Sequence, residues 1–180
     1  MFYFLLTGEI TNINTESLIH FFNSKIIDEN YSDTITIYLS SIGGDIDAAI
    51  RVYDFLKSIP NKVHTIGLSQ VDSAAITIYL AGDKRTALFN TRFRIHEPNY
   101  FIRENSALLP LYEERVNLFR ELDKRMKEIT AKEIKKDIKI IQKLYQQGKI
   151  LNTQEAKEFG MVHEILNSLP KPSSLNSPAT

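Results

Sequence analysis

The chain has 180 residues, of which 43% are hydrophobic and 24% are charged, a composition that excludes a wholly disordered protein. Basic and acidic residues both number 22, and the resulting net charge of zero argues against a dedicated binder of nucleic acid or acidic lipid. Because there are no cysteines, disulfide frameworks, zinc ribbons and thiol nucleophiles are also excluded.

The first six residues are apolar, but they are too few for a transmembrane helix and lack the basic residues of a signal peptide. We therefore expect a cytoplasmic protein without a membrane segment. Strands are predicted at residues 3–7, 34–40, 63–67, 86–88 and 92–95, and helices at 15–27, 46–59 and 73–81. Gly43 and Gly44 are expected to break the second strand. The alternation of strands and helices favours parallel crossovers and an α/β fold.

The second half is predicted to be helical and highly charged from about residue 108 to residue 147. Its apolar residues form two stripes, one of Leu118, Leu122, Met126 and Ile129 and one of Ile134, Ile138, Ile141 and Tyr145. Asn152 and Glu155 are spaced as a capping box before a short helix that Gly160 ends, and a last strand is expected at 161–165. Residues 1–167 are predicted to form one domain, and the proline- and serine-rich residues 168–180 a disordered tail.

Three local features are candidates for chemistry. Gly43 and Gly44 lie between a strand and a helix, where bare N–H groups can face an anion or a developing oxyanion. Ser73 begins an apolar helix, a position that favours negative charge on an attacked oxygen. His96 follows a strand and precedes a proline, where general bases often occur.

Each feature, taken singly, also has an ordinary structural explanation. The glycine pair can be a turn that binds nothing, Asp72 or Ser73 can be a helix N-cap, and His96 can be structural. His20 and His64, inside a predicted helix and a predicted strand, are expected to be structural.

Taken together, the features match one known pattern. Residues 37–44 resemble the strand and Asn-Ser-Pro-Gly-Gly turn of ClpP, the proteolytic subunit of the Clp protease in the ClpP/crotonase superfamily. Ser73 falls on that family's nucleophile, and residues 84–98 resemble its run ending in Ile-His-Gln-Pro. Residues 155–162 resemble its Glu-Ala-x-Glu-Tyr-Gly-Leu-Ile segment. The likeness spans residues 3–166.

The resemblance implies an α/β fold that is a ClpP/crotonase-like stack of ββα units with a protruding helical handle at residues 108–130. It implies a serine peptidase that cleaves peptides or unfolded proteins through an acyl-enzyme, without cofactor or metal, in a homo-oligomer of heptameric rings stacked face to face. By position, Ser73 would be the nucleophile and His96 the general base. The backbone N–H groups of Gly44 and Ala74 would form the oxyanion hole.

The sequence departs from the family's pattern at the third member of the catalytic triad. The family's aspartate falls on Gly148, and glycine cannot orient an imidazole or stabilise its cation. Glu97 adjoins His96, but successive residues of an extended chain point in opposite directions, so we expect it to be a poor substitute. A backbone carbonyl, Gln146, Gln147 or water are the remaining candidates.

Other departures concern the substrate groove and the partner. Ile42 replaces a proline, and Ala74-Ala75 replaces Met-Gly, but both changes keep the backbone donors. Residues 99–104 lack the glycines of the family's substrate-pairing segment, which indicates an altered or blocked groove. Met1 begins at the first predicted strand, without the N-terminal loops that meet an ATPase unfoldase, which speaks against docking to such an ATPase.

Three functions therefore compete. The first is a ClpP-like serine peptidase with an unusual or missing third triad member. The second is a catalytically impaired ClpP-like subunit that serves as an assembly or regulatory partner. The third is a crotonase-like acyl-CoA enzyme, for which the chain is short and the serine and histidine have no usual role.

Overall fold

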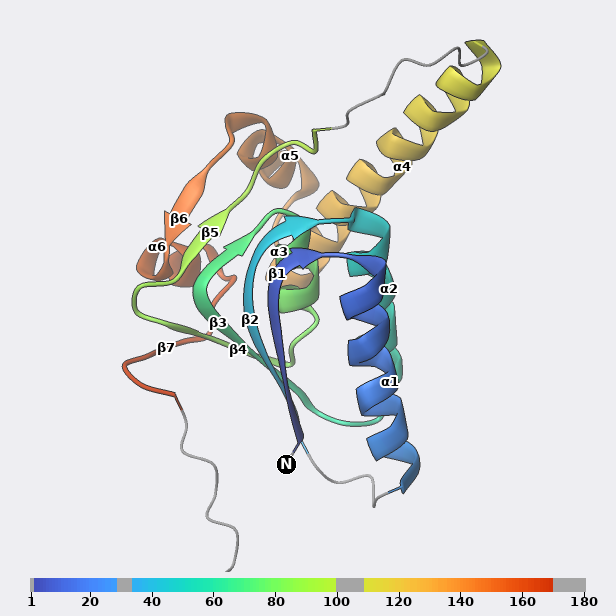
Figure 1. The fold of residues 1–180 in the computed structure, drawn as a ribbon. Coiled ribbons are helices and arrows are strands. Elements are labelled where there is room, and N and C mark those ends of the chain that lie inside the picture. The colour runs from blue at the N-terminus through green and yellow to red at the C-terminus, as the bar shows by residue number, and fades with distance from the viewer. Residues whose placement is uncertain (1, 29–33, 100–108, 170–180) are drawn as a thin grey trace, which may run out of the picture.

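In the computed structural model, the described residues are 2–28, 34–99 and 109–169, and they form one seven-stranded sheet with six helices (Figure 1). The strands are β1 (Phe2–Ile10), β2 (Ile35–Gly44), β3 (Val63–Asp72), β4 (Lys84–Leu88), β5 (Arg92–Arg94), β6 (Ile150–Asn152) and β7 (Glu164–Leu166). The helices are α1 (Asn12–Asp28), α2 (Ile46–Ser58), α3 (Ala74–Leu80), α4 (Leu109–Ile134), α5 (Ile138–Gln147) and α6 (Thr153–Phe159).

The sheet branches at β3. The main order is β1-β2-β3-β4-β7, with every neighbouring pair parallel, which confirms the predicted α/β class. The first half of β3 pairs with β4, whereas its last three residues pair with β5, and β5 pairs with β6 in antiparallel fashion. Because β3 changes partner, the chain that follows β5 is brought beside the chain that follows β3.

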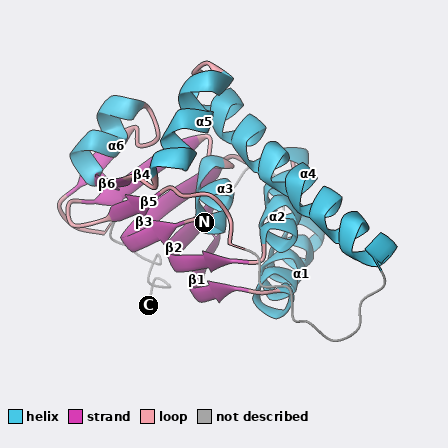
Figure 2. Ribbon diagram, turned by 90° about the horizontal axis from the view of Figure 1, so that it is seen from above, coloured by secondary structure: helices cyan, strands magenta, loops and turns pink. Residues whose placement is uncertain are grey.

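The core lies between the sheet and the helices α1, α2 and α3, which stand side by side in Figures 1 and 2. The predicted alternation in β2 is confirmed, since Ile35, Ile37 and Leu39 are all buried, and every residue of α3 is buried as well. On β1, by contrast, Tyr3 and Leu5 are 62% and 57% exposed, so part of this strand's apolar surface is uncovered in the single chain.

The prediction that the glycine pair breaks the second strand is wrong. The strand β2 continues to Gly44, and its last two residues pair with Glu9 and Ile10 of β1 after a shift in register. Gly43 and Gly44 have φ values of 91° and 145°, which side chains disfavour, and a Cβ atom on Gly44 would collide with the carbonyl oxygen of Ile10. The glycines allow a close approach between strands and do not end the pairing.

The predicted helical stretch at 108–147 is two helices. The helix α4 protrudes from the body of the protein (Figure 1) and ends at Ile134, after which Lys135 has a φ of 54°. Asp137 then caps α5 by accepting a hydrogen bond from the Lys139 N–H, and this local bond restarts the helix in a new direction.

The C-terminal predictions are confirmed in part. Asn152 and Glu155 form the predicted capping box, and Gly160 ends α6 in the left-handed conformation. The last strand is β7, three residues later than the predicted start at 161. Most of the predicted tail, residues 170–180, and most of the altered groove segment, residues 100–104, lie outside the described residues.

His64, on β3, is hydrogen-bonded to the neighbouring strand β4, close to β7. Its Nε2 lies 2.9 Å from Thr86 Oγ1, and the neighbouring Lys84 pairs with Glu164. Burial lowers the pKa of His64, Lys84 lowers it further, and Glu164 opposes the shift. The folded protein therefore binds a proton at His64 at lower pH than the unfolded chain does.

We expect the melting temperature to fall as the pH drops from about 7.5 to about 5.5. A group with a lowered folded pKa contributes stability above its unfolded pKa of about 6.5 and loses that contribution as the pH falls through the folded value. His64→Asn should show a smaller fall than the wild type by differential scanning fluorimetry. His20→Asn, at an exposed position on α1, is the matched control, and equal slopes for all three proteins would contradict the prediction.

Candidate active site

The pairing of β3 with β5 brings Ser73 and His96 to one cavity. Asp72 pairs with Arg94 in the ladder, and the Ser73 N–H continues it with a 2.8 Å hydrogen bond to the Arg94 carbonyl. His96 follows two residues later. The cavity has a volume of about 770 Å³ and is lined by Glu9, Ile42, Gly43, Gly44, Asp45, Ile46, Asp47, Ser73, Arg94, His96, Pro98, Asn99, Leu118, Phe119 and Leu122.

Ser73 lies at a sharp turn between β3 and α3. Its φ and ψ of 56° and −127° fall in a region that residues other than glycine rarely adopt. Although Ser73 occupies the N-cap position of α3, its side chain makes no capping hydrogen bond. Asp72 does not cap the helix either, because its carboxylate binds Arg92 and the Arg94 N–H. Ser73 thus occupies the predicted N-cap position, but neither its side chain nor that of Asp72 makes a capping hydrogen bond.

The glycine pair packs directly against this turn. A Cβ atom on Gly43 would lie 2.6 Å from Ser73 Cβ and 3.1 Å from the Ala74 nitrogen, so only glycine fits there without displacement. Gly44 also lines the cavity, while Ala74 is buried behind Ser73 in the first turn of α3. In the first turn of a helix the leading backbone N–H groups lack partners within the helix, and in α3 that of Ile76 donates a 3.0 Å hydrogen bond to the Ser73 carbonyl.

His96 is held by the backbone next to it. Its Nδ1 lies 2.7 Å from the carbonyl oxygen of Glu97, and a carbonyl oxygen can only accept, so Nδ1 must carry the proton. In the neutral ring the lone pair is then on Nε2, the nitrogen that a general base uses. Ser73 Oγ and His96 Nε2 make no hydrogen bond to any residue in the described ranges, a looseness that is common in unliganded sites.

The chain that leads to His96 runs antiparallel to the chain that follows Gly148. The Ile95 N–H donates a 2.7 Å hydrogen bond to the Lys149 carbonyl, which extends the pairing of β5 with β6 toward His96 and Gly148. Gly148 ends α5 in the left-handed conformation, and a Cβ atom there would meet nothing within 4 Å. No described carboxylate, and neither Gln146 nor Gln147, hydrogen-bonds to the imidazole.

The carboxylate of Glu97 points to α4. Both of its oxygens accept hydrogen bonds from Lys127 Nζ, at 2.8 and 3.0 Å. This agrees with the expectation that Glu97 cannot replace the aspartate through its side chain. Sequence reasoning missed Lys127, whose only signal was its place beside Met126 in the first apolar stripe of α4.

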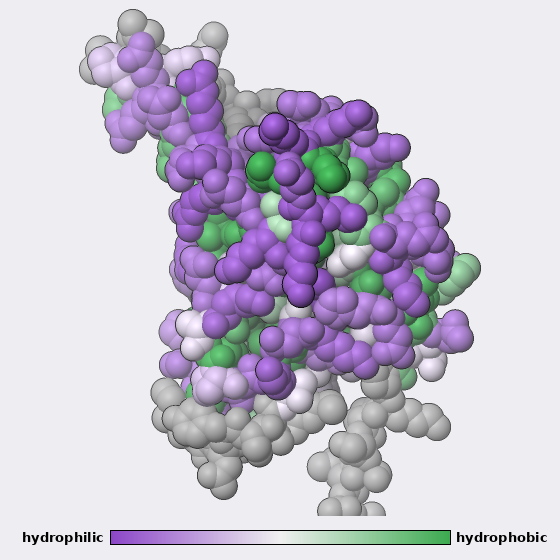
Figure 3. Space-filling model, turned by 180° about the vertical axis from the view of Figure 1, so that it is seen from behind, coloured by the Kyte–Doolittle hydropathy of each residue, from purple (hydrophilic) through white to green (hydrophobic). Residues whose placement is uncertain are grey.

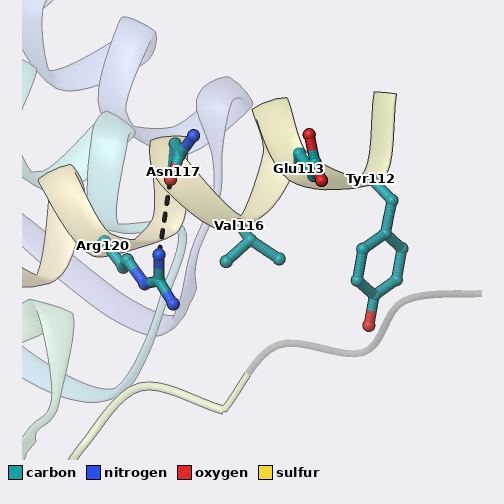
Figure 4. Close-up of a pocket in the computed structure, with 5 residues that line it drawn as sticks. All are labelled: Tyr112, Glu113, Val116, Asn117 and Arg120. Atoms are coloured by element: carbon teal, nitrogen blue, oxygen red, sulfur yellow. Dashed lines mark hydrogen bonds between the residues drawn. The ribbon is translucent and has the colours of Figure 1, made fainter. Parts of the chain in front are cut away.

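The first apolar stripe of α4 divides between core and cavity. Met126 is fully buried and Leu122 nearly so, but Leu118 is 54% exposed and faces the cavity together with Phe119. A second hollow of about 450 Å³ lies near the outer end of α4 (Figure 4), where Arg120 donates a 3.5 Å hydrogen bond to Asn117. The described residues that line this hollow include no serine or histidine.

The described residues contain neither a membrane-spanning helix nor a group of side chains that could hold a metal ion. None of the helices in residues 2–28, 34–99 and 109–169 is long and apolar enough to cross a membrane. Within the same ranges, no three histidine, aspartate or glutamate side chains gather into a group that could hold a metal ion.

The fold is similar to that of a known peptidase subunit. A solved mutant structure of ClpP1 from Listeria monocytogenes is 29% identical in sequence and matches with a TM-score of 0.79, covering 92% of this chain and 91% of that one. The architecture is thus the ClpP-like α/β fold that the resemblance implied.

The sequence comparison agrees with the fold. The model of the Clp protease family matches residues 4–169, and the chain therefore belongs to this family. The ATP-dependent Clp protease proteolytic subunit of Paracoccus denitrificans is 34% identical over 78% of this chain and 70% of its own length. Proteolytic subunit 2 of Borreliella burgdorferi is 28% identical over 91% of this chain and 82% of its own length. Proteolytic subunit 2 of Treponema denticola is 30% identical over 89% of this chain and 80% of its own length.

The contact between Gly43 and Ser73 predicts a specific loss of stability. We expect Gly43→Ala to lower the free energy of unfolding by roughly 1–2 kcal/mol for its positive φ and by about 1–3 kcal/mol more for the crowded Cβ. Gly8→Ala is the matched control, because Gly8 also has a positive φ but has open space around its Cβ position. Urea unfolding that gives equal losses for the two variants would contradict the close contact.

Proposed function

We propose that the protein is a serine peptidase that hydrolyses peptide bonds through an acyl-enzyme on Ser73. The observation that carries the proposal is the conformation of Ser73. Ser73 has a strained backbone, its hydroxyl makes no capping hydrogen bond, and it lines the same cavity as His96 and the glycine pair. Strain of this kind persists where the surrounding structure enforces it, and it clusters at active sites. Membership of the Clp protease family supports the same interpretation.

In the proposed reaction, His96 Nε2 takes the proton of the Ser73 hydroxyl while Oγ attacks the carbonyl carbon of the peptide bond. The tetrahedral intermediate then collapses as His96 gives the proton to the leaving amine, the C–N bond breaks, and an ester remains on Ser73. Water, deprotonated by His96, attacks this ester, releases the acid and restores the serine. Each step is balanced by the substrate, the two side chains and one water molecule.

The oxyanion of the intermediate needs donors that are fixed in advance. We assign this role to the backbone N–H groups of Gly44 and Ala74, which lie on either side of the Gly43–Ser73 contact. Such donors typically contribute about 3–4 kcal/mol each to stabilisation of the transition state. Their rigidity is supported by the burial of Ala74 and by the pairing of Gly44 with β1.

We propose peptides or unfolded proteins as substrates, acted on within a homo-oligomeric ring. The apolar wall formed by Leu118 and Phe119 suits hydrophobic side chains of an extended substrate. Two surfaces are suited to contacts between copies, namely the uncovered Tyr3 and Leu5 on β1 and the protruding helix α4. The outer end of α4 is mainly hydrophilic in the view of Figure 3. The named relatives are subunits of ATP-dependent proteases, but none of the proposed chemical steps consumes ATP.

A second candidate function rests on Gly148. Because no carboxylate among the described residues hydrogen-bonds to His96, the chain can instead be a catalytically impaired ClpP-like subunit that acts as an assembly or regulatory partner. In chymotrypsin, replacing the triad aspartate by an amide lowers the rate by about 10⁴-fold because the imidazole takes the wrong tautomer. The two candidates differ in whether Ser73 reacts at all.

We expect wild-type protein incubated with a fluorophosphonate to gain the mass of one adduct, and Ser73→Ala to gain none. Ser69→Ala is the matched control, since Ser69 lies near the end of β3 and has the same φ of 56° as Ser73 but lies outside the cavity. It should label like the wild type. Intact-mass spectrometry that finds no adduct on a folded wild-type oligomer would favour the impaired subunit.

Restoring a carboxylate tests the second candidate directly. The open space and left-handed conformation at Gly148 accommodate aspartate or asparagine. If the wild type is impaired for want of this carboxylate, Gly148→Asp should raise the labelling rate by about 10²-fold or more, within the roughly 10⁴-fold limit of the amide effect. Gly148→Asn, which has the same shape without the charge, should not do so. Equal labelling rates for both variants and the wild type would exclude the missing carboxylate as the cause of impairment.

A further inference from the structure

We infer that the ion cluster of Lys127, Glu97 and Asp123 positions His96, and that the Glu97 carbonyl oxygen serves where a triad carboxylate is absent. The inference rests on the proposed function of Ser73 and His96. It assigns positioning roles to Glu97 and Lys127, neither of which is among the residues that line the cavity.

His96 Nδ1 donates a hydrogen bond to the Glu97 carbonyl. At 2.7 Å it is a short hydrogen bond, and it holds the tautomer that leaves Nε2 free to take the Ser73 proton. Orienting the ring and selecting this tautomer are two tasks that a triad carboxylate performs. A carbonyl dipole also favours the imidazolium, although less strongly than a full negative charge does.

The Glu97 carbonyl is held in place from two sides. The carboxylate of Glu97 is bound through both oxygens by Lys127, and Lys127 also donates a 2.7 Å hydrogen bond to Asp123 one turn earlier on α4. On the other side, Pro98 restricts the backbone of Glu97 to extended conformations. Residue 97 is therefore held by its side chain and its backbone together, and its carbonyl has little freedom to turn away from His96.

The ion cluster of Lys127, Glu97 and Asp123 is held rigidly because Lys127 is nearly buried. Lys127 is only 8% exposed, and its Nζ lies 5.7 Å from the centre of the ring of Tyr145, a buried residue whose hydroxyl is hydrogen-bonded to Thr130. Burial alone would lower the pKa of Lys127, but its hydrogen bonds to Asp123 and Glu97 outweigh burial and the pKa is raised. Lys127 is thus charged at neutral pH, and α4 supplies the anchor of His96 as well as one wall of the cavity.

The first experiment compares fluorophosphonate labelling rates. We expect Lys127→Met to label Ser73 about 10- to 100-fold more slowly than the wild type, by analogy with the loss of partners that orient metal-binding histidines. Lys127→Arg, which keeps the charge and several donors, should recover most of the rate. Lys124→Met, on the same helix at an exposed position paired with Glu121, should label like the wild type.

A double-mutant cycle tests whether Lys127 acts through Glu97. In a Glu97→Ala background, Lys127→Met should cause no further loss, because the clamp is already broken. Losses that multiply in the double variant would overturn the inference. Melting temperatures identify any variant that fails to fold. If Lys127→Met does not fold, Glu97→Gln takes its place, because it keeps the shape of the side chain but weakens the ion pair. Glu97→Gln is likewise expected to slow the labelling of Ser73.

The tautomer of His96 tests the inference even if Ser73 proves unreactive. In ¹⁵N-histidine-labelled protein at about pH 8, solid-state NMR should show His96 protonated at Nδ1 and bare at Nε2, with assignment by comparison with His96→Asn. In Lys127→Met the signals should report a mixture of tautomers. Wild-type protein protonated at Nε2, or an unchanged tautomer in Lys127→Met, would overturn the inference. Absence of labelling in the wild type alone would overturn only the proposed peptidase function.

Discussion

The three-residue pairing between the end of β3 and β5 is the constraint on which the site depends. It places the Ser73 backbone against the Arg94 carbonyl and leads the chain to His96 two residues later. The buried carboxylate of Asp72 strengthens this pairing by binding both Arg92 and the Arg94 N–H. A buried carboxylate is tolerated only when it is paired in this way, so the charge belongs to the scaffold of the site and not to its chemistry.

A second constraint is the close approach of three chain segments around Ser73. The glycine pair reaches the turn from β2, while β1 packs against the other side of Gly44. A Cβ atom on Gly43 would lie 2.6 Å from Ser73 Cβ, so the two segments are closely packed around the strained serine backbone. The strain and the close packing are therefore parts of one arrangement, in which backbone groups are held ready without a bound ligand.

The helix α4 links the proposed chemistry to the outside of the protein. Its inner half anchors Glu97 through Lys127, its middle forms the apolar wall of the cavity, and its outer half protrudes from the body. A contact that moves α4 would thus reach both the substrate groove and the imidazole. If copies of the chain assemble through α4 as proposed, contacts at its outer half are connected through the same helix to the cavity and to Glu97.

Local patterns in the chain were enough to predict most elements and the candidate residues. Alternation in β2 and the capping box at Asn152 are short-range patterns that the structure confirms as elements, and the fold brings Ser73 and His96 into one cavity. The continuation of β2 through its glycines and the hold of Lys127 on Glu97 emerged only from the folded chain. The reason is that these features depend on contacts between residues far apart in the chain, such as Glu97 and Lys127, and on side-chain directions that no local periodicity encodes.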